Sequence, residues 1–182
     1  MAGFVIAFVA IFLLGAGGRD QVLIAGLTSR LGKRVSLLAA ALVAATLTIA
    51  AAAWLASWLA AQLDAAAIRP LAALALGLAG LEMAMVRQSR IPAEPTRSLG
   101  AMTLVLLTFQ AADAVRLATF ALGLMSGATA PAAAGAILGS MAALATGWAL
   151  GDKLSATCLT RCRRWLGIAV MASAGTFLLI LR

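Results

Sequence analysis

Long apolar runs alternate with short polar breaks along the whole 182-residue chain. We expect each of six runs to be a membrane-spanning helix, because each is near or above the ~20 residues that cross ~30 Å of hydrocarbon. Ala, Leu, Val and Gly dominate the runs without the alternation typical of strands, which also favours helices. The six predicted helices cover residues 3–27, 35–62, 66–86, 99–126, 131–151 and 164–181.

The longest break, RQSRIPAEPTRS at 87–98, contains two prolines and charges of both signs. It divides the chain into a first half (1–86) and a second half (99–182) of three predicted helices each. An odd number of helices per half gives the halves opposite orientations, as in an inverted repeat. We therefore predict an all-α polytopic membrane protein built from two inverted three-helix repeats joined by a linker loop.

Composition supports a membrane protein over a soluble one. Hydrophobic residues make up 64% of the chain and charged residues 11%, with a mean hydropathy of +1.06. Soluble domains have roughly 25% charged residues. This composition excludes a soluble enzyme, and the chain shows no nucleophile–base constellation, so we expect no enzymatic activity. The expected partner is the lipid bilayer and not a nucleic acid, while the sequence leaves the oligomeric state open.

The basic residues predict how the chain is oriented in the membrane. The breaks after the first, third and fifth helices carry most of them, whereas the second and fourth carry only Arg69. Under the positive-inside rule the odd-numbered breaks are cytoplasmic and both termini lie on the other side, which fits a bacterial inner membrane. Ten of the 14 Lys and Arg residues lie in these odd breaks: Arg30, Lys33, Arg34, Arg87, Arg90, Arg97, Lys153, Arg161, Arg163 and Arg164.

Two predicted helices carry opposite charges near their centres. Arg19 and Asp20 lie in the first helix, and Asp113 and Arg116 lie in the fourth. An ionised side chain at a helix centre costs roughly 2.5–3.5 kcal/mol on insertion scales. These four residues should therefore face the protein interior and pair. We expect Arg19 to meet Asp113 and Asp20 to meet Arg116.

Other polar and small residues lie close to these charges. Gly15, Gly17 and Gly18 either open the helix and free its peptide groups or allow close helix packing, and both alternatives stay open. Gln21 and Gln110 are either ligands or structural hydrogen-bonding groups. Glu82 lies near the predicted cytoplasmic end of the third helix, where it either reaches water or takes part in an ion path.

The layout resembles the Gdt family of small cation/proton exchangers. The resemblance is carried by GAGGRDQVLIAG in the first half, QAADAVRLATFALG in the second, and the basic turn LTSRLGKR. It implies two inverted three-helix halves that exchange Mn²⁺ or Ca²⁺ for protons, with no resident cofactor. The implied ion site contains Gly15, Gly17, Gly18, Arg19, Asp20, Gln21, Gln110, Asp113 and Arg116, of which Asp20, Gln110 and Asp113 would be the metal ligands.

The signature E-x-G-D-[KR]-[TS] of that family is altered in both halves. Gly15 and Gln110 stand at the glutamate positions, and Arg19 and Arg116 accompany the two remaining acids. Because divalent cations such as Mn²⁺ prefer anionic oxygen cages, a neutral site that contains arginine suits them poorly. Three interpretations remain: a family-like exchanger, a degenerate homologue or accessory subunit that transports nothing, and a transporter of an anionic or zwitterionic solute.

Overall fold

The computed structural model describes residues 2–85, 98–111, 113–126, 129–153 and 156–180. These residues form eight α-helices and a short 3-10 turn, with no strand among them, so the all-α class is confirmed. The predicted linker at 87–98 lies almost wholly outside the described residues. The helices are α1 Ala2–Gly15, α2 Arg19–Leu31, α3 Val35–Gln62, α4 Ala65–Met85, α5 Leu99–Ala111, α6 Ala114–Ser126, α7 Thr129–Leu150 and α8 Ala156–Ile180, with the turn η1 Gly151–Lys153 between α7 and α8.

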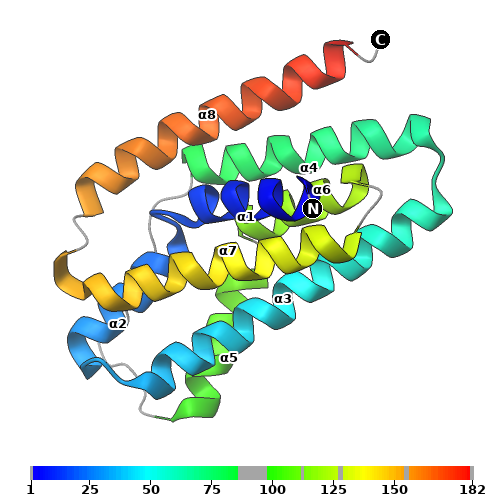
Figure 1. The fold of residues 1–182 in the computed structure, drawn as a ribbon. Helices are drawn as coiled ribbons and strands as arrows, with labels where there is room; N and C mark the ends of the chain where they lie inside the picture. Colours follow the sequence, from blue (N-terminus) through cyan, green and yellow to red (C-terminus); the bar gives the residue numbers. More distant parts are fainter. Residues whose placement is uncertain (1, 86–97, 112, 127–128, 154–155, 181–182) are drawn as a thin grey trace.

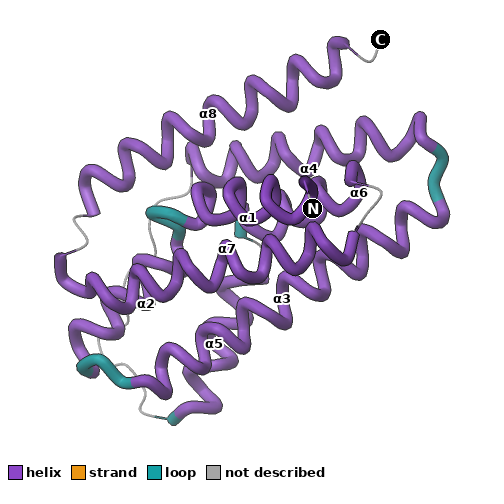
Figure 2. The backbone as a smooth tube through the Cα atoms, in the orientation of Figure 1, coloured by secondary structure: helices purple, strands orange, loops and turns teal. Residues whose placement is uncertain are grey.

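The first and fourth predicted helices are each broken near their centres. The axes of α1 and α2 differ by 58°, and those of α5 and α6 differ by 57°. The first helix does open at its glycines, and Gly15 also packs closely on α7, so the structure contains elements of both alternatives; Figure 2 shows the break as a short loop. The continuous helix predicted at 99–126 is wrong, because the chain bends immediately before Ala114. The broken spans place backbone ends inside the protein.

Three helices, α3, α4 and α7, are long and apolar enough to cross a membrane. If each bent pair counts as one span, the described residues hold up to five candidates, so a helical membrane protein is supported while six spans stay a prediction. The sixth helix is longer than predicted, since α8 begins at Ala156 and not at 164. Helix α7 begins at Thr129, which places Pro131 in its first turn, where a proline is tolerated.

Helix α1 packs against α7 and α6, and α6 also packs against α4, α3 and α7 (Figure 1). Helix α3 packs on α5, α6 and α7, and α8 packs on α4. The core is divided into hydrophobic clusters. One lies among α2, α3, α5 and α7, and a second lies among α1, α3, α4, α6 and α7. Along the chain, Asp20, Thr48, Gln110 and Asp113 each fall between a member of one cluster and a member of the other.

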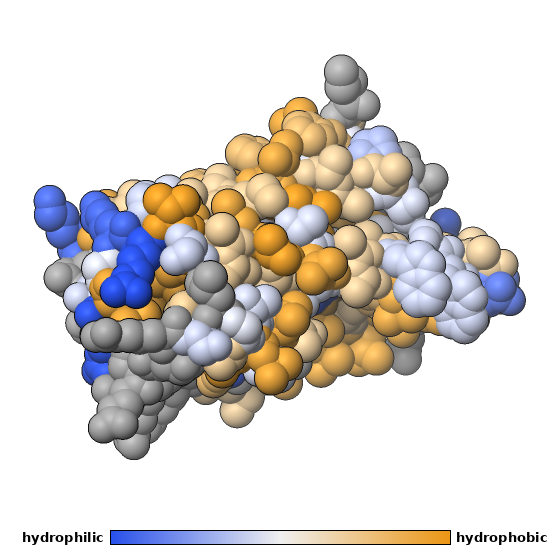
Figure 3. All heavy atoms as spheres, turned by 90° about the horizontal axis from the view of Figure 1, so that it is seen from below, coloured by the Kyte–Doolittle hydropathy of each residue, from blue (hydrophilic) through white to orange (hydrophobic). Residues whose placement is uncertain are grey.

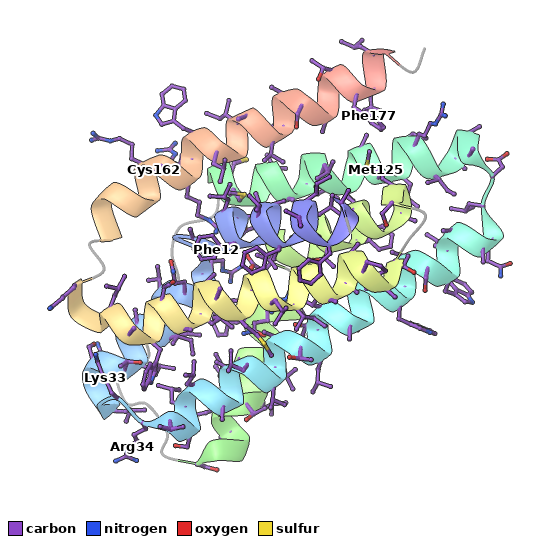
Figure 4. All side chains as sticks on the ribbon, in the orientation of Figure 1. Phe12, Lys33, Arg34, Met125, Cys162 and Phe177 are labelled. Carbon is purple, nitrogen blue, oxygen red and sulfur yellow. The ribbon has the colours of Figure 1, made fainter. Side chains whose placement is uncertain are left out.

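The surface is apolar around the middle of the molecule and polar towards its ends (Figure 3). Helix α1 begins and α8 ends at the same end of the molecule (Figure 1). Lys33 and Arg34 lie at the opposite end (Figure 4). An apolar band between two polar ends is the distribution that a lipid bilayer requires of a spanning protein.

Two helix pairs pack with their backbones in close approach. A Cβ added at Gly135 would collide with the carbonyl oxygen of Phe4, and one at Gly139 would lie 2.5 Å from that of Phe8. Gly135 and Gly139 therefore let α7 pack closely against α1. Helices α4 and α8 meet in the same way, because a Cβ at Gly80 would lie 2.6 Å from the carbonyl oxygen of Gly167.

We expect Gly135→Ala to destabilise the protein by about 1–3 kcal/mol, because the added methyl group overpacks the contact between α1 and α7. The matched control is Gly77→Ala, since a Cβ at Gly77 meets nothing within 4 Å. The melting temperature in detergent micelles should fall for the first variant and stay level or rise slightly for the second. Equal melting temperatures for the two variants would contradict the close packing.

Candidate functional site

The break between α1 and α2 depends on glycine at two positions. Gly17 has a φ of 70°, in the left-handed region that side chains disfavour. A Cβ at Gly18 would lie 2.8 Å from the carbonyl oxygen of Gly15. The N–H of Gly17 donates to Oε1 of Gln21 at 2.7 Å, so a side chain replaces a helical hydrogen bond that the break removes. Gly15 itself packs against α7, because a Cβ added there would lie 3.0 Å from Cβ of Ala143.

The break between α5 and α6 is held by Asp113. Its carbonyl oxygen accepts hydrogen bonds from the N–H groups of Arg116 at 3.0 Å and Leu117 at 3.3 Å, which starts α6. Gln110, on the last turn of α5, and Asp113 are both almost completely buried. The second break therefore delivers an amide, a carboxylate and the Arg116 guanidinium to one buried region.

Arg116 is the centre of that region. Its Nη1 lies 2.7 Å from Oδ2 of Asp20 and 3.4 Å from Oδ2 of Asp113. Its Nη2 donates to Oε1 of Gln110 at 2.8 Å, and its Nε donates to Oγ1 of Thr48 at 2.9 Å. Side-chain oxygens from α2, α3, α5 and the second break thus converge on one guanidinium, whose planar fork suits several acceptors at once.

A second group of charges adjoins the first through Asp113. Nη2 of Arg163 lies 2.6 Å from Oε2 of Glu82 and 3.4 Å from Oδ1 of Asp113. Nη1 of Arg163 also donates to the carbonyl oxygen of Leu14, at 3.4 Å, near the end of α1. Arg19 lies 3.8 Å from Oε1 of Glu82, with its guanidinium 5.6 Å from the centre of the Phe109 ring.

We call these six residues the central charge network: Arg19, Asp20, Glu82, Asp113, Arg116 and Arg163. Three arginines and three carboxylates balance within it. The network joins α2, α4, α6, α8 and the second break. Charges on different elements therefore neutralise one another. Oδ1 of Asp20 and Nε2 of Gln110 are buried and have no hydrogen-bond partner within the described part of the chain.

The structure brings together most of the residues predicted to form a site. Asp20, Gln110, Asp113 and Arg116 meet, and the predicted pairing of Asp20 with Arg116 is confirmed at 2.7 Å. The predicted pairing of Arg19 with Asp113 is wrong, because Asp113 is met by Arg116 and Arg163 while Arg19 faces Glu82. The bend after Gly15 turns the start of α2 and so directs Arg19 towards α4.

Gln21 belongs to a separate contact between α2 and α7. Its Nε2 donates to the carbonyl oxygen of Ala143 at 2.9 Å and to Oγ1 of Thr146 at 2.8 Å. Its Oε1 accepts from Gly17, as described above. The two donated hydrogen bonds hold the first break against α7, and the accepted one lies within the break itself. This indicates a structural hydrogen-bonding role for the Gln21 side chain.

Two members of the site do not follow from the sequence analysis. The sequence groups Arg163 with Arg161 and Arg164 in a basic cytoplasmic break, yet Arg163 is 3% exposed, while its two neighbours in that group are exposed. The basic run gives no sign of which arginine turns inward. Thr48 does leave a signal, because it is a hydroxyl residue at the centre of the predicted helix 35–62. Glu82 was expected either to reach water or to take part in an ion path, and it is paired with Arg163 inside the protein.

The three predicted metal ligands surround an arginine. Asp20, Gln110 and Asp113 each place a side-chain oxygen within 3.4 Å of the Arg116 guanidinium. Among the described residues, no group of three or more His, Cys, Asp or Glu side chains is arranged to hold a metal ion. One oxygen of each of these three side chains is therefore engaged by a protein cation.

Two cavities adjoin the network, and they differ greatly in size. The larger, about 410 Å³, is lined by Thr48, Ala51, Ala52, Leu55, Ala111, Arg116, Leu117 and Phe120. Arg116 is the one charged side chain among these described lining residues. The smaller, about 10 Å³, lies beside Gly15, Gly18, Asp20, Gln21 and Asp113, and it is too small to admit a solute.

No protein-family model, curated protein or solved structure matched this chain in the comparisons. The resemblance to the Gdt exchangers therefore stays an expectation. What can be said of function has to come from the network and the two cavities.

We expect Arg163→Gln to destabilise the fold by about 3–5 kcal/mol, because it leaves the buried Glu82 carboxylate without its close partner. Arg164→Gln is the matched control, since the adjacent Arg164 is exposed, and it should change stability by less than about 0.5 kcal/mol. Unfolding in mixed micelles would measure both values.

The double variant Glu82→Gln/Arg163→Gln tests whether the loss comes from the pair. We expect it to be less destabilised than the sum of the two single variants, because it leaves no unpaired charge at this contact. Strict additivity of the three measured free energies would show that the 2.6 Å contact carries no coupling.

Proposed function

We propose that this protein is a membrane transporter of a small anionic or zwitterionic solute, built from two inverted halves. Discontinuous helices whose breaks meet at a buried polar site are typical of secondary transporters, where they form the substrate site. The single observation that carries the choice of solute is the larger cavity, where Arg116 is the one charged side chain among the lining residues that the structure describes. A solute in that cavity meets a guanidinium first, and the carboxylates only behind it.

The helix boundaries support the two inverted halves. Helix α6 begins and ends 95 residues after α2, at Ala114 and Ser126 against Arg19 and Leu31. Helix α8 ends 95 residues after α4, at Ile180 against Met85. The pair α1–α2 and the pair α5–α6 run in opposite directions along the molecule (Figure 1). A shared spacing at these boundaries with reversed direction is what an inverted duplication produces.

Side-chain contacts repeat with the same spacing. Gln21 on α2 bonds to Ala143 on α7, and Arg116 on α6 bonds to Thr48 on α3. Arg116 lies 95 residues after Gln21, and Ala143 lies 95 residues after Thr48. Each contact joins the two halves, and the 95-residue shift relates one contact to the other. In this relation Arg116 is the counterpart of a neutral glutamine, which makes the two halves electrostatically unequal.

Exchange of Mn²⁺ or Ca²⁺ is less well supported by the geometry. Asp20, Asp113 and Gln110 would have to release Arg116 before they could bind a metal ion. A second candidate is a protein that transports nothing, in which the network only holds the two halves together. The pairing of Asp20 with Arg116 and of Asp113 with Arg163, together with the cavity of about 10 Å³ beside them, favours that alternative.

Flux into proteoliposomes separates these functions. The probes are radiolabelled sulfate, phosphate and glycine, alongside Mn²⁺ and Ca²⁺ with and without a proton gradient. We expect uptake of at least one anionic or zwitterionic probe, and a loss of roughly tenfold or more in Arg116→Gln, which removes a charged hydrogen-bonding group. Gly77→Ala serves as the control variant with unchanged flux.

Two other results would count against the proposal. Gradient-driven uptake of Mn²⁺ or Ca²⁺ alone would favour the family-like exchanger. Background uptake of all five probes by folded protein would favour the structural role.

A further inference from the structure

The two halves differ beside the central charge network, where one has a cavity and the other has a filled contact. We infer that the 410 Å³ cavity next to Arg116 is the open entrance to the central site, and that the equivalent entrance between α2 and α7 is closed by Gln21 and Gly147. This inference rests on the proposed function. It adds the route by which a solute reaches the site and the residues that close the alternative route.

The open side follows one face of α3. Thr48, Ala51, Ala52 and Leu55 are spaced three and four residues apart, so they line the cavity over two helical turns. Helix α3 runs towards the end of the molecule where α1 begins and α8 ends (Figure 1). The cavity therefore leads from Arg116 towards that end. Its walls are mostly small or apolar, so a solute passing along it would find its charged contact only at Arg116.

The closed side follows the equivalent face of α7. The residues 95 positions after Thr48, Ala51 and Ala52 are Ala143, Thr146 and Gly147. Gln21 donates to the carbonyl oxygen of Ala143 and to Oγ1 of Thr146. The position equivalent to the cavity is thus filled by a hydrogen-bonded side chain.

Gly147 allows this closure. A Cβ at Gly147 would lie 2.6 Å from Cγ of Gln21 and 2.8 Å from the Gln21 carbonyl oxygen. Since the second atom belongs to the backbone, α2 would have to move away from α7 to admit even a methyl group. At the equivalent position of the first half stands Ala52, which lines the cavity. The pairing of one open and one closed entrance across an inverted repeat is the arrangement that alternating access requires.

Thiol labelling tests the entrance without any measurement of flux. In protein whose two cysteines are replaced by serine, Ala52→Cys places a thiol in the cavity, and Leu47→Cys places one on the exposed apolar surface of the same helix. A membrane-impermeant methanethiosulfonate reagent is applied to each side of oriented proteoliposomes. We expect reaction at position 52 from the side of the termini only, and at least roughly tenfold slower reaction at position 47, where lipid excludes the ionised thiol.

The closed entrance is tested in the same Ala52→Cys background. Gly147→Ala should force α2 away from α7 and favour a state in which the entrance between α2 and α7 is open and the cavity beside Arg116 is closed. Labelling at position 52 should therefore slow by roughly tenfold. Gly77→Ala should leave the labelling rate unchanged, because its Cβ meets nothing. Gln21→Met, which removes the hydrogen bonds to α7, provides a second route to the same shift if Gly147→Ala does not fold.

These results keep the inference separate from the proposed function. Labelling at position 52 that is as slow as at position 47, or that comes from the other side, overturns the open entrance. Unchanged or faster labelling in both Gly147→Ala and Gln21→Met overturns the gate. Labelling as expected in a protein without flux of any probe would retain the entrance and reject transport.

Discussion

The structure depends on the mutual neutralisation of charges within an apolar protein. An ionised side chain facing hydrocarbon costs several kcal/mol, so six of them are tolerable only if they pair inside the bundle. Three arginines and three carboxylates do so here, and they come from five different parts of the fold. Because each arginine contacts a carboxylate on another element, the network also determines how the helices sit against one another. Asp113 is the link between its two parts, since it contacts both Arg116 and Arg163.

The broken helices make such a network geometrically possible. In the middle of a continuous helix the backbone groups are paired with one another, and the side chains project radially from the helix axis. The two bends of nearly 60° allow Asp20 and Arg116, both near the first turns of new helices, to approach from different directions. Gly17 supplies the backbone conformation for the first bend, whereas Asp113 supports the second through its carbonyl oxygen. The two bends therefore reach similar angles by different local chemistry.

Arg116 occupies the position among the central oxygens where the resemblance to cation exchangers implies a metal ion. Its guanidinium is surrounded by oxygens of Asp20, Asp113, Gln110 and Thr48, which is the kind of environment that a bound cation has. The positive charge is thus part of the chain, and the same side chain lines the larger cavity. An exchanger layout with an attached cation at its centre would present a positive group to an incoming solute.

Composition and run length were enough to predict a helical chain that is apolar enough for a membrane. The depth of the central charges also required them to pair, and the pairing of Asp20 with Arg116 was predicted correctly. The contact of Arg19 with Glu82 and the inward position of Arg163, in contrast, follow from how the helices pack. Neighbouring arginines in one basic run look alike in sequence, and the direction in which each points depends on where α8 begins and how it packs on α4. The bend before Ala114 was not predicted, because no glycine marks it in the sequence.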